Sequence, residues 1–208
     1  MSIVNKLVKS RDTLIEMLND RGIDTSDYTK LTDEEVNILF NTMPKNSKDK
    51  APLDIIIGNS PKVYIKYSLV SRIRVNNIIS LVEEISEDLS ENDTLIIVIR
   101  EKLTTDSLLE TFFKTLYDTK KIFCQYFHLD ILTFNITQHI LVPKHEKLNE
   151  TEKTALIHEL NIKTINQLPI IYKTDPVAKY YGLKENDICK ITRPSETTAI
   201  YETYRLCQ

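Results

Sequence analysis

Apolar residues recur every three or four positions near the start of the chain, which is the spacing of one face of a helix. This pattern predicts an amphipathic helix over residues 3–20. A second helix is predicted over residues 33–42, because Thr32 and Glu35 have the spacing of a capping box. The polar segment 44–52 that follows contains two prolines and like charges, and is typical of a loop.

The middle of the chain alternates between short strand patterns and longer helix patterns. Two β-branched or aromatic runs, 53–57 and 63–67, flank a Gly-Asn-Ser-Pro segment and predict a hairpin. The run 94–99 is apolar on both faces, as expected of a strand in the middle of a sheet. The remaining elements predicted here are helices at 72–88 and around 108–116 and a strand at 122–127. Such alternation predicts an α/β layered domain on which the two N-terminal helices pack.

The C-terminal third has short elements and special turn residues. Asp175 can cap a helix whose first residue is Pro176, and Gly182 fits the left-handed residue that ends it. A helix under two turns long is not stable alone, so we expect strands to hold it. Asn149 and Glu152 predict a longer helix that buries Leu156, Ile157 and Leu160. Strand patterns occupy 168–171, 187–191 and 198–206, and residues 193–196 have the composition of a turn that enters a helical cap.

These patterns predict a mixed α/β protein of the α+β type with two domains. The first, residues 1–136, is an α/β layered domain, and the second, residues 137–208, is a small mixed α/β domain. Either is long enough to bury a core of its own.

Composition excludes several classes of function. The formal net charge is −3, divided as −4 over residues 1–138 and +1 over residues 139–208. Tight non-specific DNA binding needs a basic face, so we expect duplex DNA to be contacted weakly and only within a larger assembly. The local candidates are basic residues near predicted helix starts, where free N–H groups attract phosphates. They are Arg72, Arg74, Arg100 and Lys102.

Metal, cofactor and membrane sites are not expected. The three cysteines form no Cys-x-x-Cys pair, which argues against zinc and disulfides. His128, His139, His145 and His158 lack zinc-like spacing, and His139 and His145 fit structural hydrogen bonds better. No apolar run approaches the roughly 20 residues of a membrane span. No small-molecule substrate is indicated.

Catalytic candidates are weak. A metal-dependent nuclease could use an Asp on one strand with an acidic-x-Lys triplet on the next, and Asp54 and Lys66 have about that placement. Tyr64 stands where the second carboxylate would bind the cation, which argues against the site. Ser195 lacks the context of a nucleophile. We therefore predict no catalytic residue, and keep a nuclease-like enzyme and a free-standing DNA-binding adaptor as alternatives.

The stretch from His139 onward resembles the assembly domain of the shared fifth subunit of eukaryotic nuclear RNA polymerases, a family with an archaeal relative that lacks the N-terminal domain. The resemblance covers the whole C-terminal third and extends at lower similarity over the N-terminal part. The matching positions are His139, Leu141-Val142-Pro143-Lys144-His145, Leu148, Glu152, Gln167-Leu168-Pro169, Asp175-Pro176-Val177-Ala178, Tyr180, Gly182-Leu183-Lys184, Lys190-Ile191, Arg193-Pro194-Ser195-Glu196-Thr197, Tyr201 and Tyr204-Arg205.

The resemblance implies a non-catalytic subunit of a multisubunit DNA-directed RNA polymerase. The C-terminal domain would dock on the largest subunit, and the N-terminal jaw domain would support the downstream DNA cleft. Its site of action would be the nucleus for a cellular polymerase, and the virion or cytoplasmic factory for that of a large DNA virus. The implied partner-binding residues are His139, Pro143, His145, Gln167, Pro169, Asp175, Pro176, Tyr180, Gly182, Arg193, Ser195, Tyr204 and Arg205.

The resemblance also adds Thr105 and Ser107 to the DNA-proximal candidates, because the family has a Thr-Pro-Ser-Ala turn at the matching helix start. Here Asp106 replaces the Pro, and a carboxylate repels phosphate. Ile170 stands where the family usually has Arg, while Asn186, Ala199 and Ile200 replace a common Gly, Gly and Arg. Because Asn tolerates a left-handed turn, Asn186 preserves the bend, and the loss of Arg at positions 170 and 200 indicates a partner surface that has drifted.

Overall fold

The computed structural model describes residues 2–42, 52–58, 61–70, 73–101, 103, 107–195 and 199–208. The chain forms two compact units, Met1–Phe134 and Asn135–Gln208. The division lies two residues before the boundary expected from the sequence. Mixed helix and strand in both units agree with the predicted fold class.

The first unit is built around a four-stranded sheet of order β1-β2-β3-β4, in which β1 is antiparallel to β2 and the other pairs are parallel. This confirms the predicted hairpin and the central position of β3. The elements are α1 (Ile3–Asp20), α2 (Asp33–Asn41), β1 (Ile55–Ile57), β2 (Val63–Ser68), α3 (Val75–Glu87), β3 (Thr94–Ile99), α4 (Ser107–Lys120), β4 (Phe123–His128) and the 3-10 turn η1 (Ile131–Thr133). The loop predicted at 44–52 lies almost entirely outside the described residues.

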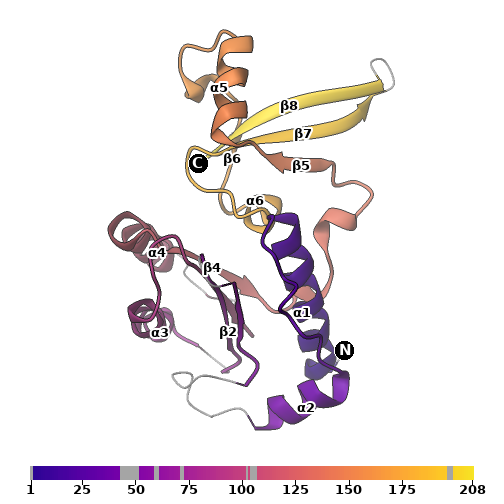
Figure 1. Cartoon of the computed structure of the whole chain (residues 1–208), viewed down its shortest axis with the longest axis vertical. Helices are drawn as coiled ribbons and strands as arrows, with labels where there is room; N and C mark the ends of the chain where they lie inside the picture. The colour runs from indigo at the N-terminus through magenta and orange to yellow at the C-terminus, as the bar shows by residue number, and fades with distance from the viewer. Residues whose placement is uncertain are drawn as a thin grey trace. The chain divides into compact units, whose positions relative to one another are not determined.

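Helices cover both faces of this sheet (Figure 1). Helices α3 and α4 pack on one face through a core that includes Ile78, Leu109 and Ile97. On the other face α1 buries Leu14 and places Ser10 Oγ 3.1 Å from the hydroxyl of Tyr67. Strand β2 is therefore buried along its whole length. The capping box predicted at the start of α2 is present.

The second unit has a sheet of order β5-β7-β8-β6, with α6 on one face and α5 on the other. Cys189, Ile191 and Cys207 pack with Ala178 of α6. The opposite face packs Leu156 of α5 onto residues that include Ile188 and Leu206. The elements are η2 (Ile136–Gln138), β5 (Lys144–Lys147), α5 (Glu150–Glu159), η3 (Ile165–Gln167), β6 (Ile170–Ile171), α6 (Pro176–Tyr180), β7 (Ile188–Ser195) and β8 (Ala199–Cys207).

The short helix α6 forms as predicted. The Asp175 carboxylate accepts hydrogen bonds from the backbone N–H groups of Val177 and Ala178, at 2.8 and 3.4 Å. Gly182 and Asn186 have φ angles of 62° and 70°, so both adopt the left-handed conformation expected of them. Packing of the fully buried Ala178 stabilises a helix too short to persist alone.

Two local predictions are wrong. Residues Arg193–Ser195 form the end of β7 and not a turn, because each pairs with β8, the last as Ser195↔Ala199. Cross-strand pairing thus overrides the turn preference of Pro194. Leu160, which we expected in the core, is 48% exposed, since the helix ends one residue before it.

Candidate functional site

The acid–base pair considered for a nuclease does come together, deep in the first unit. Lys66 Nζ lies 2.9 Å from Asp54 Oδ2, and these side chains are only 2% and 7% exposed. The Tyr64 hydroxyl donates to the same oxygen at 3.1 Å, and the backbone N–H of Tyr67 donates to Oδ1 at 3.1 Å. Burial, and then the Asp54 charge, raise the pKa of Tyr64 above its ordinary value. The Asp54 carboxylate therefore holds β2 in position and is not accessible to a substrate.

Metal ligands do not gather in the described residues: no group of three or more His, Cys, Asp or Glu side chains is arranged to hold an ion there. None of the described helices combines the length and apolarity needed to cross a membrane.

His139 and His145 both make the structural hydrogen bonds expected of them. His145 is buried, its Nδ1 lies 2.7 Å from the Pro143 carbonyl oxygen, and its ring stacks on Tyr181 with centroids 6.4 Å apart. Burial lowers the pKa of His145, and the bond to Pro143 opposes this only in part. His139 Nδ1 accepts from the backbone N–H of Leu141 at 3.2 Å.

We expect acid to destabilise the C-terminal unit through His145. Its folded-state pKa is lowered from an ordinary value of about 6.5, so near and below that pH the unfolded chain binds a proton that the folded chain does not. Stability is therefore fully present above about pH 6.5 and falls as the pH drops below it, by at most about 1.4 kcal/mol per pH unit. Urea unfolding of the full chain between pH 7.5 and 5 measures this slope. The variant His145→Asn should flatten it, and equal slopes would contradict the assignment.

The partner-binding residues implied by the resemblance separate by burial. Three are buried: His145, Tyr180 and Gly182. Tyr180 accepts a hydrogen bond from Asn135 Nδ2 at 3.0 Å. These three residues therefore contribute to the packing of the second unit. The exposed or half-buried members are His139, Pro143, Gln167, Pro169, Asp175, Pro176, Arg193, Ser195, Tyr204 and Arg205.

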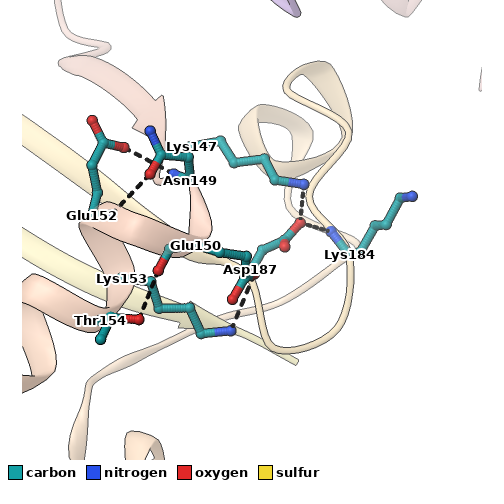
Figure 2. Close-up of polar contacts among 8 residues, drawn as sticks. All are labelled: Lys147, Asn149, Glu150, Glu152, Lys153, Thr154, Lys184 and Asp187. Atoms are coloured by element: carbon teal, nitrogen blue, oxygen red, sulfur yellow. Dashed lines mark hydrogen bonds and ion pairs between the residues drawn. The ribbon is translucent and has the colours of Figure 1, made fainter.

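Polar contacts fix the frame that carries these residues (Figure 2). Asn149 and Glu152 form the reciprocal capping box predicted for α5, with both bonds at 2.8 Å. Asp187 Oδ2 accepts from the backbone N–H of Lys184 and lies 2.6 Å from Lys147 Nζ. Asp187 thereby ties the end of β5 to the turn before β7, a role that the sequence pattern did not reveal.

A turn in the second unit displays two apolar side chains that we did not predict as site residues. Ile140 is 94% and Leu141 81% exposed. The turn is closed by the bond from the Val142 N–H to the His139 carbonyl oxygen at 2.8 Å, besides the Leu141–His139 contact. Adjacent exposed apolar residues held in a fixed turn are typical of an interaction surface. The available signal was an apolar pair outside any helix or strand pattern.

The described DNA-proximal candidates belong to one edge of the first sheet. Parallel strands β2, β3 and β4 end in register at Ser68, Ile99 and His128, and α3 and α4 both begin beyond that edge. Arg100, which follows β3, Arg74, the N-cap of α3, and Ser107, the first residue of α4, are exposed. Helix N-termini here attract anions. Arg72, Lys102 and Thr105 lie outside the described residues.

Comparisons with known proteins agree along the chain. A family model described as RNA polymerase Rpb5, C-terminal domain, matches residues 134–207. A Dictyostelium discoideum protein, DNA-directed RNA polymerases I, II, and III subunit rpabc1, is 32% identical over 209 residues, covering 100% of both chains. The Arabidopsis thaliana DNA-directed RNA polymerase V subunit 5A is 32% identical over 92% of this chain and 83% of its own. The Caenorhabditis elegans subunit RPABC1 is 28% identical over 97% and 95%.

Proposed function

The chain belongs to the Rpb5 family of DNA-directed RNA polymerase subunits, and from this membership we propose that it is a non-catalytic structural subunit of such a polymerase. The observation that carries the proposal is the full-length similarity to the Dictyostelium subunit, since both units then have counterparts in one polymerase component. The polymerisation chemistry belongs to other subunits. The chain acts where its polymerase acts, which is the nucleus for a cellular enzyme.

The C-terminal unit docks on the largest subunit of the polymerase. The exposed apolar pair Ile140 and Leu141 supports this, because burying it in a partner removes apolar surface from water. The neighbouring His139 is exposed and fixes the turn. Asp175, Pro176 and Gly182 act indirectly, since they fix the backbone of the docking unit.

The N-terminal unit supports downstream duplex DNA inside the assembly. Arg74 at the N-terminus of α3 and Arg100 after β3, both on the carboxyl edge of the sheet, suit a phosphate backbone. The small number of described basic groups there, and the acidic balance of residues 1–138, suit a contact that is weak outside the assembly.

Affinity purification of the tagged full-length chain from its native cells tests the proposal. We expect the two largest polymerase subunits to co-purify in amounts comparable to the tagged chain. Recovery of the chain without any polymerase subunit would overturn it. The same preparation should bind duplex DNA weakly with a shallow salt dependence and should not cleave it with Mg²⁺. Nanomolar binding at physiological salt would favour the adaptor, and cleavage lost in Asp54→Ala would favour the nuclease.

A further inference from the structure

The hairpin β7–β8 extends beyond the strands that flank it (Figure 1). Strand β5 pairs with β7 only as far as Lys144↔Thr192. Strand β6 pairs with β8 only at Ile170↔Leu206 and Ile171↔Cys207. Among the described residues, no strand pairs with the outer side of β8 upstream of Leu206.

Two backbone hydrogen bonds fix which groups of β8 face that open side. The N–H of Leu206 points away from β7 and donates to the Pro169 carbonyl oxygen at 2.8 Å. The N–H of Cys207 points the other way and donates to the Asp187 carbonyl oxygen at 2.8 Å. The backbone N–H and C=O groups of successive residues in a strand point alternately to its two sides. Those of Glu202 and Tyr204 therefore point outward, like those of Leu206. Pro169 has no N–H, so β6 cannot extend its pairing to them.

The two edges of the hairpin differ. On β7 the backbone N–H and C=O groups of the even-numbered residues point away from β8, as the bond from the Leu148 N–H to the Ile188 carbonyl oxygen shows. Pro194 is one of them, so it lacks the N–H that would otherwise be offered there. Proline is a common device against unwanted strand addition. The edge of β7 is thus protected against the addition of a strand, while β8 keeps outward backbone donors and acceptors at Glu202 and Tyr204.

The side chains around the open edge of β8 differ in charge between the two faces of the sheet. On the face of α5, Glu202 is already paired with Lys190, at 2.6 Å. On the face of α6, Arg193 lies opposite the 57% exposed Tyr201, and Arg205 donates to the Ile170 carbonyl oxygen at 3.2 Å across the edge. Neither arginine has an ion-pair partner in the described part of the chain. This face is therefore complementary to carboxylates.

We propose that an acidic, extended segment of another polymerase subunit adds to β8 as a further strand. Outward N–H and C=O groups two residues apart match the spacing of an extended polypeptide. Its carboxylates pair with Arg193 and Arg205, and its main chain bonds to Glu202 and Tyr204. The inference rests on the proposed function and specifies how the C-terminal unit holds its partner.

Glu202→Pro in the full-length chain tests the strand addition. Proline removes one outward N–H and places a ring in the path of an added strand, but no bond to β7 is lost. We expect the apparent affinity for the co-expressed polymerase subunits to fall about tenfold or more. The matched variant Glu202→Ala loses the side-chain ion pair but keeps the N–H, and should bind within about twofold of the original chain.

Each result has a separate meaning. If the original chain binds no polymerase subunit, the proposed function fails. If the original chain and Glu202→Pro bind equally well, docking stands and strand addition is overturned. Hydrogen exchange decides the matter even if the proline variant misfolds, because the Glu202 and Tyr204 amides should become protected on assembly, and unchanged exchange would overturn the proposal. Dimers of the free chain that Glu202→Pro abolishes would also overturn it, in favour of a second copy as occupant.

The charge of the added segment has its own test. Arg193→Glu should weaken association about tenfold, with a smaller salt dependence than the original chain, because one exposed attraction becomes a repulsion. Lys163→Glu changes charge equally at an exposed position outside β7 and β8 and should have little effect. Equal losses in the two variants would show that only net charge matters and would contradict an acidic strand.

Discussion

Replacing Asp54 with Ala is expected to lower the free energy of unfolding by about 3–5 kcal/mol. The substitution removes the carboxylate that pairs with the buried Lys66 ammonium and accepts from the Tyr64 hydroxyl and the Tyr67 N–H. An uncompensated buried charge costs far more than a lost surface contact. Urea unfolding of the full chain, followed by far-ultraviolet circular dichroism, measures the loss.

Two companion variants make that result specific. Asp12→Ala breaks an exposed pair with Lys30 and should cost less than about 1 kcal/mol. Asp54→Leu combined with Lys66→Met removes both charges and should recover much of the stability. A loss below about 1 kcal/mol for Asp54→Ala would contradict the buried pair.

The largest functional effect is expected at the apolar turn. Ile140→Asp with Leu141→Asp should reduce co-purification with the largest polymerase subunit about 100-fold or more, because two apolar anchors become charges that the partner must desolvate. Both side chains are exposed in the free chain, so the fold should keep its stability. Quantitative immunoprecipitation of the double variant measures the effect.

Ile38→Asp is the matched control for the turn. Ile38 is 61% exposed on α2 of the other unit and should tolerate the charge without loss of binding. Full recovery of polymerase by the turn variant would mean that docking uses another surface.

Periodicity and capping signals predicted most of the elements of this fold. The helix over residues 3–20 and the capping box of Thr32 and Glu35 are local patterns, and both are confirmed. The strand character of Arg193–Ser195 was missed because it depends on pairing with β8, which no local window contains. The 3-10 turns after β4 carry no periodic signal and were also not predicted.

The functional surface was harder to predict than the fold. A resemblance identifies matching positions but does not separate residues that shape a unit from residues that face a partner. His145 and Tyr180 matched as well as Arg193, yet the first two are buried and the third is exposed. Ile140 escaped notice because an apolar residue in a sequence is normally assigned to a core.

The cysteines suit the chain to site-specific labelling. Cys124, Cys189 and Cys207 are all buried, and burial raises the pKa of their thiols to about 12, 11 and 11. Since the thiolate is the reactive form, none should react readily with maleimides at neutral pH. A cysteine introduced at an exposed position in each unit would then carry a fluorophore without background. Energy transfer between the two dyes could follow the separation of the units as the polymerase assembles around them.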